Sequence, residues 1–199
     1  MGLGKQAKTL NRTQIKMISE FLLKNRYGLR DQTIFYFSVK CGLRSKEISN
    51  LKWSMVMNSD GSVGGYLNLP NSSSKGRSGR VVPLNKDLKK NLEMLLEEHQ
   101  ILNDFDPQTS FIVRTERSKS TTPQSIVNMF QRWYGRLGLV GCSSQSGRRT
   151  FITETSKKIT TVGGSLRDVQ LMVGHSSLQT TQRYIESDSE SQRKVVDLL

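Results

Sequence analysis

The sequence has few cysteines and no long apolar run. Cys41 and Cys142 are the only cysteines among 199 residues, and neither has another Cys or a His at metal-ligand spacing, so we predict buried free thiols. No apolar run approaches the roughly 18 residues of a membrane span, which argues against a membrane partner. The N-terminus lacks the apolar core of a secretory signal, and Gln6 stands where a myristoylation signal has Ser or Thr. These absences predict a cytoplasmic protein.

Acidic residues are also scarce relative to basic ones. The chain has 30 Lys and Arg against 17 Asp and Glu, a formal net charge of +13, which indicates a polyanionic partner. Apolar residues still make up 35% of the chain and recur periodically, so we expect a folded protein rather than a disordered basic one. The length favours a single domain.

Helical periodicity covers most of the chain. Residues 1–11 show no periodicity and predict a flexible basic arm, after which Thr13 is a candidate helix cap. Helices are predicted from residue 13, at 31–41, 45–51 and 88–96, from Pro123 after a Thr122 cap, and at 149–159, 165–174 and 177–186.

The residue pattern changes between Trp53 and Leu84. Short β-prone pieces at 55–57, 66–69 and 80–84 are separated by turn residues and predict a small antiparallel sheet. The last two pieces are joined by a Ser- and Gly-rich loop with basic residues near its tip. The predicted fold is therefore mainly α with a small antiparallel β-sheet, an α+β class.

Basic side chains gather in four places: Arg44 with Lys46, Lys75 with Arg77 and Arg80, Arg148 with Arg149, and His175. Taken singly, each has an ordinary explanation as a solvated cation or a helix cap, and a lone helical Tyr184 is usually a core residue. An Arg at a helix start, where cations are disfavoured and anions favoured, gains if a phosphate lies beside it.

Together these residues form a coherent set for phosphodiester chemistry. A tyrosine can displace a sugar oxygen to give a phosphotyrosine, while cationic donors stabilise the phosphoryl oxygens and a lysine protonates the leaving group. The set needs neither a metal nor a cofactor, and the sequence shows no Asp, Glu and His cluster with metal-ligand spacing.

Four stretches resemble the catalytic domain of the tyrosine recombinases, the phage integrase family: residues 41–53, 74–84, 145–151 and 174–184. They occur in the order typical of that family, and the resemblance spans residues 12–188. It implies the tyrosine recombinase catalytic-domain fold.

The resemblance also implies a role for each matching residue. Arg44 and Arg148 would clamp the scissile phosphate, and Lys75 would act as general acid. His175 would donate to a phosphoryl oxygen, and Tyr184 would be the nucleophile. Further DNA contacts are assigned to the neighbouring basic residues Lys46, Arg77, Arg80 and Arg149.

One position departs from the family pattern. Three residues before Arg148, where the family usually has His, stands Gln145, which cannot exchange a proton near neutral pH. We therefore expect slowed cleavage or an inactive chain.

The leading hypothesis is a site-specific DNA recombinase, or integrase, that acts on double-stranded DNA through a 3'-phosphotyrosyl intermediate in a bacterial or phage-infected cell. The alternatives are a catalytically impaired DNA-binding module of the same fold and a type IB topoisomerase-like enzyme. Relatives carry an additional N-terminal clamp domain, so we expect a fragment or a naturally minimal recombinase. A tetramer on paired sites is expected, with the tail at 189–199 docking on a neighbouring subunit or folding back.

Overall fold

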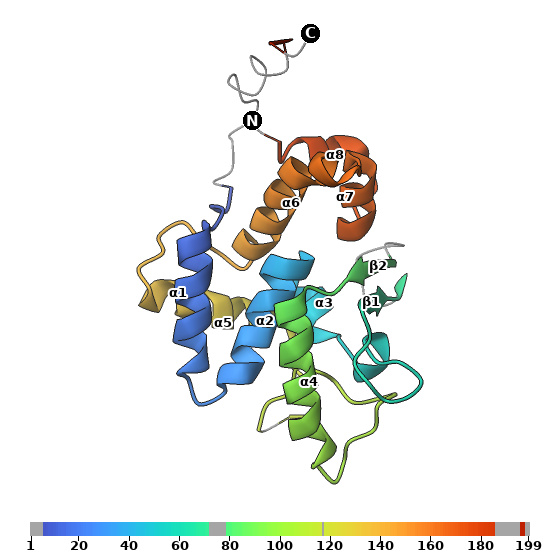
Figure 1. Ribbon diagram of the computed structural model, residues 1–199. Helices are drawn as coiled ribbons and strands as arrows, with labels where there is room; N and C mark the ends of the chain where they lie inside the picture. The colour runs from blue at the N-terminus through green and yellow to red at the C-terminus, as the bar shows by residue number, and fades with distance from the viewer. Residues whose placement is uncertain (1–5, 72–78, 117, 186–195, 198–199) are drawn as a thin grey trace.

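The elements follow the chain in an order dominated by helices (Figure 1). The computed structural model describes residues 6–71, 79–116, 118–185 and 196–197. The α-helices are α1 (Arg12–Leu23), α2 (Gly28–Cys41), α3 (Ser45–Ser49), α4 (Lys86–Gln100), α5 (Pro123–Arg136), α6 (Ser146–Lys158), α7 (Leu166–Val173) and α8 (Leu178–Gln182). Two 3-10 helices, η1 (Trp53–Met55) and η3 (Ile159–Val162), and the strands β1 (Tyr66–Leu69) and β2 (Arg80–Pro83) complete the described elements. The predicted α+β class is confirmed.

The segment before α1 differs from the predicted flexible arm. Leu10 is buried and its amide donates to Thr150 Oγ1 at 2.8 Å, while the amide of Lys8 donates to the carbonyl of Gly141 at 3.1 Å. Residues 8–10 are therefore fixed against the body of the protein, because an apolar side chain and two amides find partners there. Residues 1–5 lie outside the described residues.

The N-cap of helix α1 lies two residues earlier than predicted. Asn11, not Thr13, is the N-cap: its side chain accepts from the amide of Gln14, and the Gln14 side chain accepts from the amide of Asn11. Both residues can cap a helix, but only Asn11 has a Gln three positions on to complete a capping box.

Helix α2 lies at the centre and contacts α1, α4 and α6. It ends at Gly42, whose φ of 66° is left-handed and favours glycine. Helix α6 crosses α2 closely at Gly147, where a Cβ atom would lie 2.4 Å from Ser38 Oγ. The two glycines let the start of α6 approach the end of α2, and this junction forms one side of the candidate site.

The sheet is a two-stranded antiparallel hairpin in which Tyr66 pairs with Pro83 and Leu69 with Arg80. Strand β2 contacts α7, so the hairpin lies between α3 and the last helices (Figure 1). The predicted β piece at 55–57 is not a strand of this sheet: η1 ends at Met55, the first residue of the piece, and Met57 forms only an isolated bridge with Val63. The backbone of this piece forms part of the turn after the buried Trp53.

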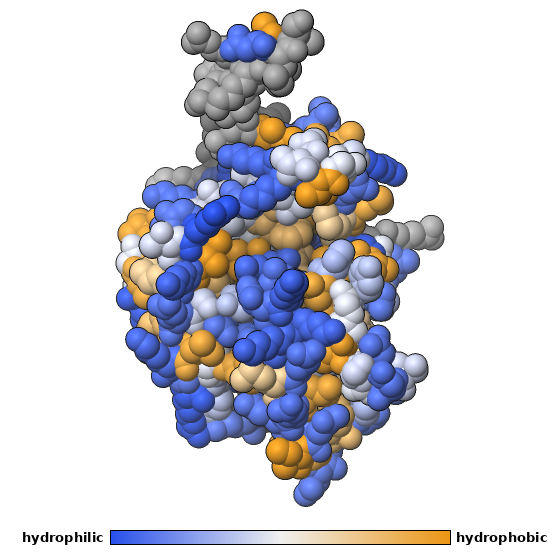
Figure 2. All heavy atoms as spheres, viewed as in Figure 1, coloured by the Kyte–Doolittle hydropathy of each residue, from blue (hydrophilic) through white to orange (hydrophobic). Residues whose placement is uncertain are grey.

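Two hydrophobic clusters support the fold. The larger includes residues of α1 to α5, whereas the smaller consists of Ile152, Val169 and Val173, with Tyr184 among the half-buried residues packed on it. Both cysteines are free thiols, as predicted, but only Cys41 is buried as expected, whereas Cys142 is half-buried. Figure 2 shows hydrophilic residues over most of one face and hydrophobic ones between them near its centre.

Candidate active site

Arg44 lies at the start of α3, where Glu47 on the first turn holds it. Arg44 is the residue preceding the helix, and its amide donates to Glu47 Oε2 at 2.8 Å. Its guanidinium Nη1 lies 3.3 Å from Glu47 Oε1, and the side chain remains 30% exposed. An acid at this helix position satisfies an otherwise unpaired amide, so the sequence of α3 itself places the arginine.

Arg148 connects the two hydrophobic clusters. It lies in the first turn of α6, is 3% exposed, and donates through Nη1 to the carbonyl of Gly42 and through Nη2 to that of Val173 at 2.8 Å. These carbonyls belong to the ends of α2 and α7, which leave carbonyls without helical partners. A buried cation is thereby held by two helix C-termini.

His175 and Tyr184 are stacked beside this arginine. The two rings lie 5.7 Å apart between centroids with an interplanar angle of 24°. His175 follows Gly174, the left-handed C-cap of α7, and its Nδ1 lies 3.0 Å from Thr181 Oγ1. Tyr184 was predicted on a helix spanning 177–186, but α8 ends at Gln182 and the tyrosine lies in the turn that follows.

The charges of the site depend on one another. Burial and the positive charge of Arg44 lower the pKa of Arg148 to about 9, with Glu47 opposing. Burial, together with Arg148, Arg44 and Arg80, lowers the pKa of His175 to about 4. Burial raises the pKa of Glu47, but the hydrogen bonds and charge of Arg80 and the amide of Arg44 outweigh it, so its pKa is lowered. The guanidinium groups of Arg44, Arg80 and Arg148 therefore lie near a single ionised carboxylate, that of Glu47. The excess of positive charge makes the site suited to binding an anion.

A hollow of about 340 Å³ opens beside Tyr184. It is lined by Gln6, Ala7, Gln145, Arg148, Arg149, Thr180, Arg183 and Tyr184. Gln145 is exposed there and precedes the first residue of α6, without a side-chain hydrogen bond to the helix start. Arg149 donates to Gln6 Oε1, so the segment before α1 forms part of the wall.

The structure brings together Arg44, Arg148, His175 and Tyr184 from four separate segments, with Gln145 at the edge of the same site. Lys46 is exposed on α3. Lys75 and Arg77 lie outside the described residues.

The structure contradicts the prediction that Arg80 contacts DNA. Its side chain is 4% exposed and pairs with Glu47, so its charge faces a buried carboxylate rather than solvent. The prediction failed because it rested on the local clustering of basic residues, whereas the partner is 33 positions away in the sequence.

Sequence reasoning missed three residues at the site. Glu47 is 1% exposed and links Arg44 to Arg80, Thr181 contacts His175, and Arg183 lines the hollow. Glu47 had a detectable signal, since an acid three residues after a helix-start position is typical of a cap. Nothing in the local sequence distinguishes Thr181 from other helical threonines.

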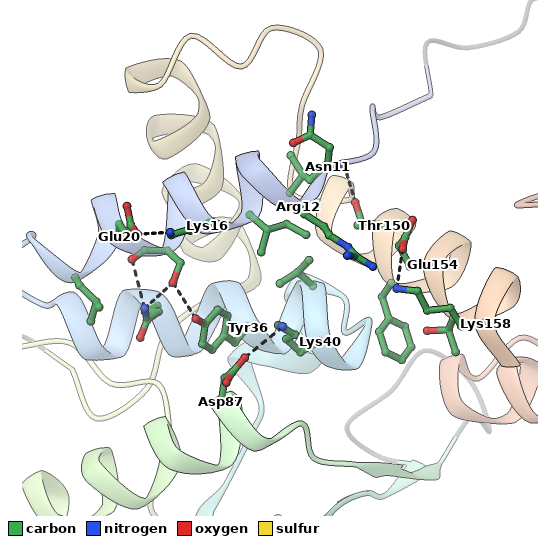
Figure 3. A pocket seen from close by; sticks show the side chains of 18 residues that line it. Asn11, Arg12, Lys16, Glu20, Tyr36, Lys40, Asp87, Thr150, Glu154 and Lys158 are labelled. Carbon is green, nitrogen blue, oxygen red and sulfur yellow. Dashed lines mark hydrogen bonds and ion pairs between the residues drawn. The ribbon is translucent and has the colours of Figure 1, made fainter. Parts of the chain in front are cut away.

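A larger hollow of about 830 Å³ lies between α1, α2 and α6 (Figure 3). Charged residues on its rim pair with one another, as in Lys40 with Asp87 at 3.4 Å and Lys158 with Glu154 at 3.0 Å. It includes none of the predicted catalytic residues. Within the described part of the chain, no three His, Cys, Asp or Glu side chains form a group suited to a metal, and no helix is long and apolar enough to cross a membrane.

The architecture is that of the catalytic domain of a tyrosine recombinase. The crystal structure of XerA recombinase superposes with a TM-score of 0.73 at 22% identity, covering 96% of this chain and 64% of that one. The Tn1549 transposon integrase in complex with a circular intermediate DNA gives a TM-score of 0.76 at 15% identity, covering 99% of this chain and 67% of that one.

Sequence comparison gives the family. Residues 8–191 match the phage integrase family, and the chain belongs to it. Tyrosine recombinase XerC of Proteus mirabilis is 27% identical over 192 residues, which cover 96% of this chain and 58% of the relative. Tyrosine recombinase XerA of Thermococcus onnurineus is 27% identical over 190 residues, covering 94% and 61%. The chain thus spans less than two thirds of these relatives.

Proposed function

We propose that the protein is a site-specific DNA recombinase that cuts and rejoins duplex DNA through a covalent 3'-phosphotyrosyl intermediate. The observation that carries this proposal is the convergence of Arg44, Arg148, His175 and Tyr184 on one site next to an open hollow. Two proteins of similar fold, the Tn1549 transposon integrase in complex with a circular intermediate DNA and XerH site-specific recombinase bound to difH, hold DNA, which supports the same substrate class.

Each residue has a defined part in the reaction. The Tyr184 oxygen attacks phosphorus, gives its proton to water in the open hollow and forms the phosphotyrosine bond, while the bond from phosphorus to the 5'-oxygen breaks. Arg44, Arg148 and His175 donate to the phosphoryl oxygens, whose charge increases in the transition state. Lys75 supplies the proton that the departing 5'-oxygen takes up. Rejoining reverses these steps with a 5'-hydroxyl of another strand, so no cofactor or metal is required.

Gly42 and Val173 explain why the arginine clamp suits this reaction. Both carbonyls fix Arg148 before substrate arrives, so little reorganisation is needed when charge develops on the phosphate. Tyr184 is placed by its packing on the smaller cluster and by its stack on His175. The exposed Lys46 and the half-buried Arg149 extend the basic surface along the DNA backbone.

The test is incubation with a suicide DNA duplex that carries a nick beside the cleavage site, in buffer containing EDTA. Wild-type protein should give a covalent protein–DNA adduct on a denaturing gel, and Tyr184→Phe should give none while binding the same DNA. An adduct that requires Mg²⁺, or one that persists in Tyr184→Phe, contradicts the proposed chemistry.

A second function is favoured by Gln145, which occupies the position of the usual histidine in the same hollow as Tyr184. A chain without turnover would serve as a DNA-binding module. It would bind duplex DNA and form no adduct in the same experiment. Relaxation of a supercoiled plasmid lacking paired sites would instead indicate topoisomerase activity.

DNA binding itself is tested by measuring how the affinity depends on salt concentration. With a net charge of +13 and six to ten phosphate contacts, affinity should fall roughly a thousandfold to a hundred-thousandfold between about 50 and 200 mM salt. A flat response in an anisotropy titration contradicts binding through the phosphate backbone.

A further inference from the structure

Arg80 occupies a position in the site that its sequence neighbourhood did not predict. It lies at the start of β2, and its guanidinium meets Glu47 with both ends, Nη1 to Oε1 at 2.8 Å and Nη2 to Oε2 at 3.1 Å. Its Nε donates to the carbonyl of Met172 at 2.7 Å. A paired fork of this kind fixes both partners more firmly than a single contact does.

Glu47 therefore has two arginine partners, and they are not equivalent. Arg80 contacts both carboxylate oxygens and is 4% exposed, whereas Arg44 reaches Oε1 with one nitrogen at 3.3 Å and is 30% exposed. The buried carboxylate is balanced mainly by the buried arginine. Arg44, which is partly exposed, uses only one of its guanidinium nitrogens to contact Glu47, so most of its donors point elsewhere.

Arg80 also acts on the other side of the site. It holds the carbonyl of Met172, and Arg148 holds that of the next residue, Val173. These carbonyls belong to the C-terminal turn of α7, immediately before Gly174 and His175. The close approach of Arg80 to Gly174, where a Cβ would lie 3.0 Å from Nη1, shows that this turn is packed directly on the guanidinium.

We propose that Arg80 is a positioning residue that engages the Glu47 carboxylate, so that Arg44 remains available to the scissile phosphate, and that fixes the turn carrying His175. This inference rests on the proposed function. It assigns to Arg80 no contact with DNA.

The physical reason lies in the cost of an unpaired buried carboxylate. If the Arg80 cation is removed, Glu47 is left in a buried environment with Arg44 as its remaining arginine contact. Arg44 would then turn both ends of its fork toward Glu47 and compete with the phosphate for the same donors. The loss of cleavage rate on removal of the Arg80 cation should therefore depend on the charge of the scissile group and on the charge of Glu47.

The experiment measures single-turnover adduct formation at saturating protein on two suicide duplexes, one with a normal scissile phosphate and one with an uncharged methylphosphonate. Arg80→Met should slow the reaction on the phosphate about 10- to 100-fold relative to wild type, and on the methylphosphonate less than about 3-fold. Arg80→Met with Glu47→Gln should recover at least about 5-fold on the phosphate, because the carboxylate that recruits Arg44 is gone.

The controls separate this role from a structural one. Circular dichroism and thermal unfolding are recorded for every variant, and Arg80→Lys, which keeps the charge without the fork, should react at an intermediate rate if Arg80→Met does not fold. Equal slowing on both duplexes, or no recovery in the double variant, overturns the inference. Absence of an adduct from wild type contradicts the proposed function, and the inference falls with it.

Discussion

The imidazole of His175 stacks on the phenol ring of Tyr184, 5.7 Å away between centroids, while its Nδ1 is within hydrogen-bonding distance of Thr181. The position of the proposed nucleophile, in the turn after α8, is thus tied to the residue that follows the C-cap of α7. Because burial and three arginines lower the pKa of His175 to about 4, the free protein holds this ring neutral at pH 7.

The first prediction is that neither histidine titrates near its ordinary pH in the free protein. Burial, with Arg114, also lowers the pKa of His99 to about 4, and its Nδ1 accepts from Trp53 Nε1 at 3.0 Å. The chain has only these two histidines, so their ring proton resonances are readily assigned by NMR. Both should stay constant between pH 5.5 and 8. Bound DNA should raise the pKa of His175 alone, since an adjacent phosphate favours the charged ring. A midpoint near 6.5 without DNA contradicts the geometry.

The second prediction is a loss of stability in mild acid. The folded-state pKa of His99 lies below its ordinary value of 6.5, so between pH 6.5 and 4 the unfolded chain binds a proton that the folded chain excludes. The free energy of unfolding is therefore unaffected by His99 above pH 6.5 and falls below it, by up to about 1.4 kcal/mol per pH unit. His99→Asn should lose less stability than wild type between pH 6.5 and 4.5 in urea titrations. Parallel losses in the two proteins contradict this origin.

The third prediction compares two helical glycines. Gly147→Ala places a Cβ 2.4 Å from Ser38 Oγ in the tight crossing of α2 and α6, and should lower the free energy of unfolding by about 1–3 kcal/mol. Gly135→Ala is the matched control: it lies in α5 with no atom within 4 Å of the new Cβ, and should be neutral or stabilising by up to about 1 kcal/mol. If Gly147→Ala and Gly135→Ala change the free energy of unfolding equally in chemical denaturation, the helices α2 and α6 are packed less tightly at their crossing than the 2.4 Å approach indicates.

The sequence predicted those features that local chemistry decides. Thr122 before Pro123 and the Ser165 with Asp168 capping box both lie at helix starts in the structure, because a cap is formed by residues a few positions apart. Helix α6 begins at Ser146 rather than near Arg149, since its first turn is buried against α2. The separate motifs of the site were recognised individually.

Contacts between distant segments were not predictable in the same way. Glu47 pairs with Arg80 across 33 residues and Arg148 reaches Gly42 across 106, and no periodicity records such pairs. A basic residue at the start of a strand, close to other basic residues in the sequence, was interpreted as a DNA contact, but the structure places a buried carboxylate opposite it. The error at Arg80 therefore has a physical cause, which is tertiary packing.

The fourth prediction concerns Gln145. It lines the same hollow as Tyr184, so Gln145→His places a proton-transferring group beside the reaction. Cleavage should accelerate by about 10²- to 10⁴-fold, the usual contribution of general acid–base catalysis, with DNA affinity nearly unchanged. Gln145→Asn serves as the control, since it keeps the amide and should remain slow. Equal adduct rates in wild type and Gln145→His would show that an imidazole is dispensable here.

The fifth prediction is that the C-terminal tail links subunits on DNA. Residues 187–192 are polar, whereas Val195, Val196, Leu198 and Leu199 form an apolar end. The 11 residues from Tyr184 to Val195 span on the order of 35 Å if extended, enough to reach a neighbouring subunit.

Deleting residues 190–199 should leave binding to a single site intact but reduce the multimeric complexes on paired sites, measured by native gel and light scattering. The matched control replaces the four apolar residues by Ser and keeps the length, so that loss of apolar burial is separated from loss of chain. Both variants should fail to assemble, because the apolar end supplies the contact and the polar tether only its reach. If the serine variant assembles as wild type does while the deletion fails, the apolar end is not the contact. If both assemble normally, the tail folds back on its own subunit, and assembly depends on another surface.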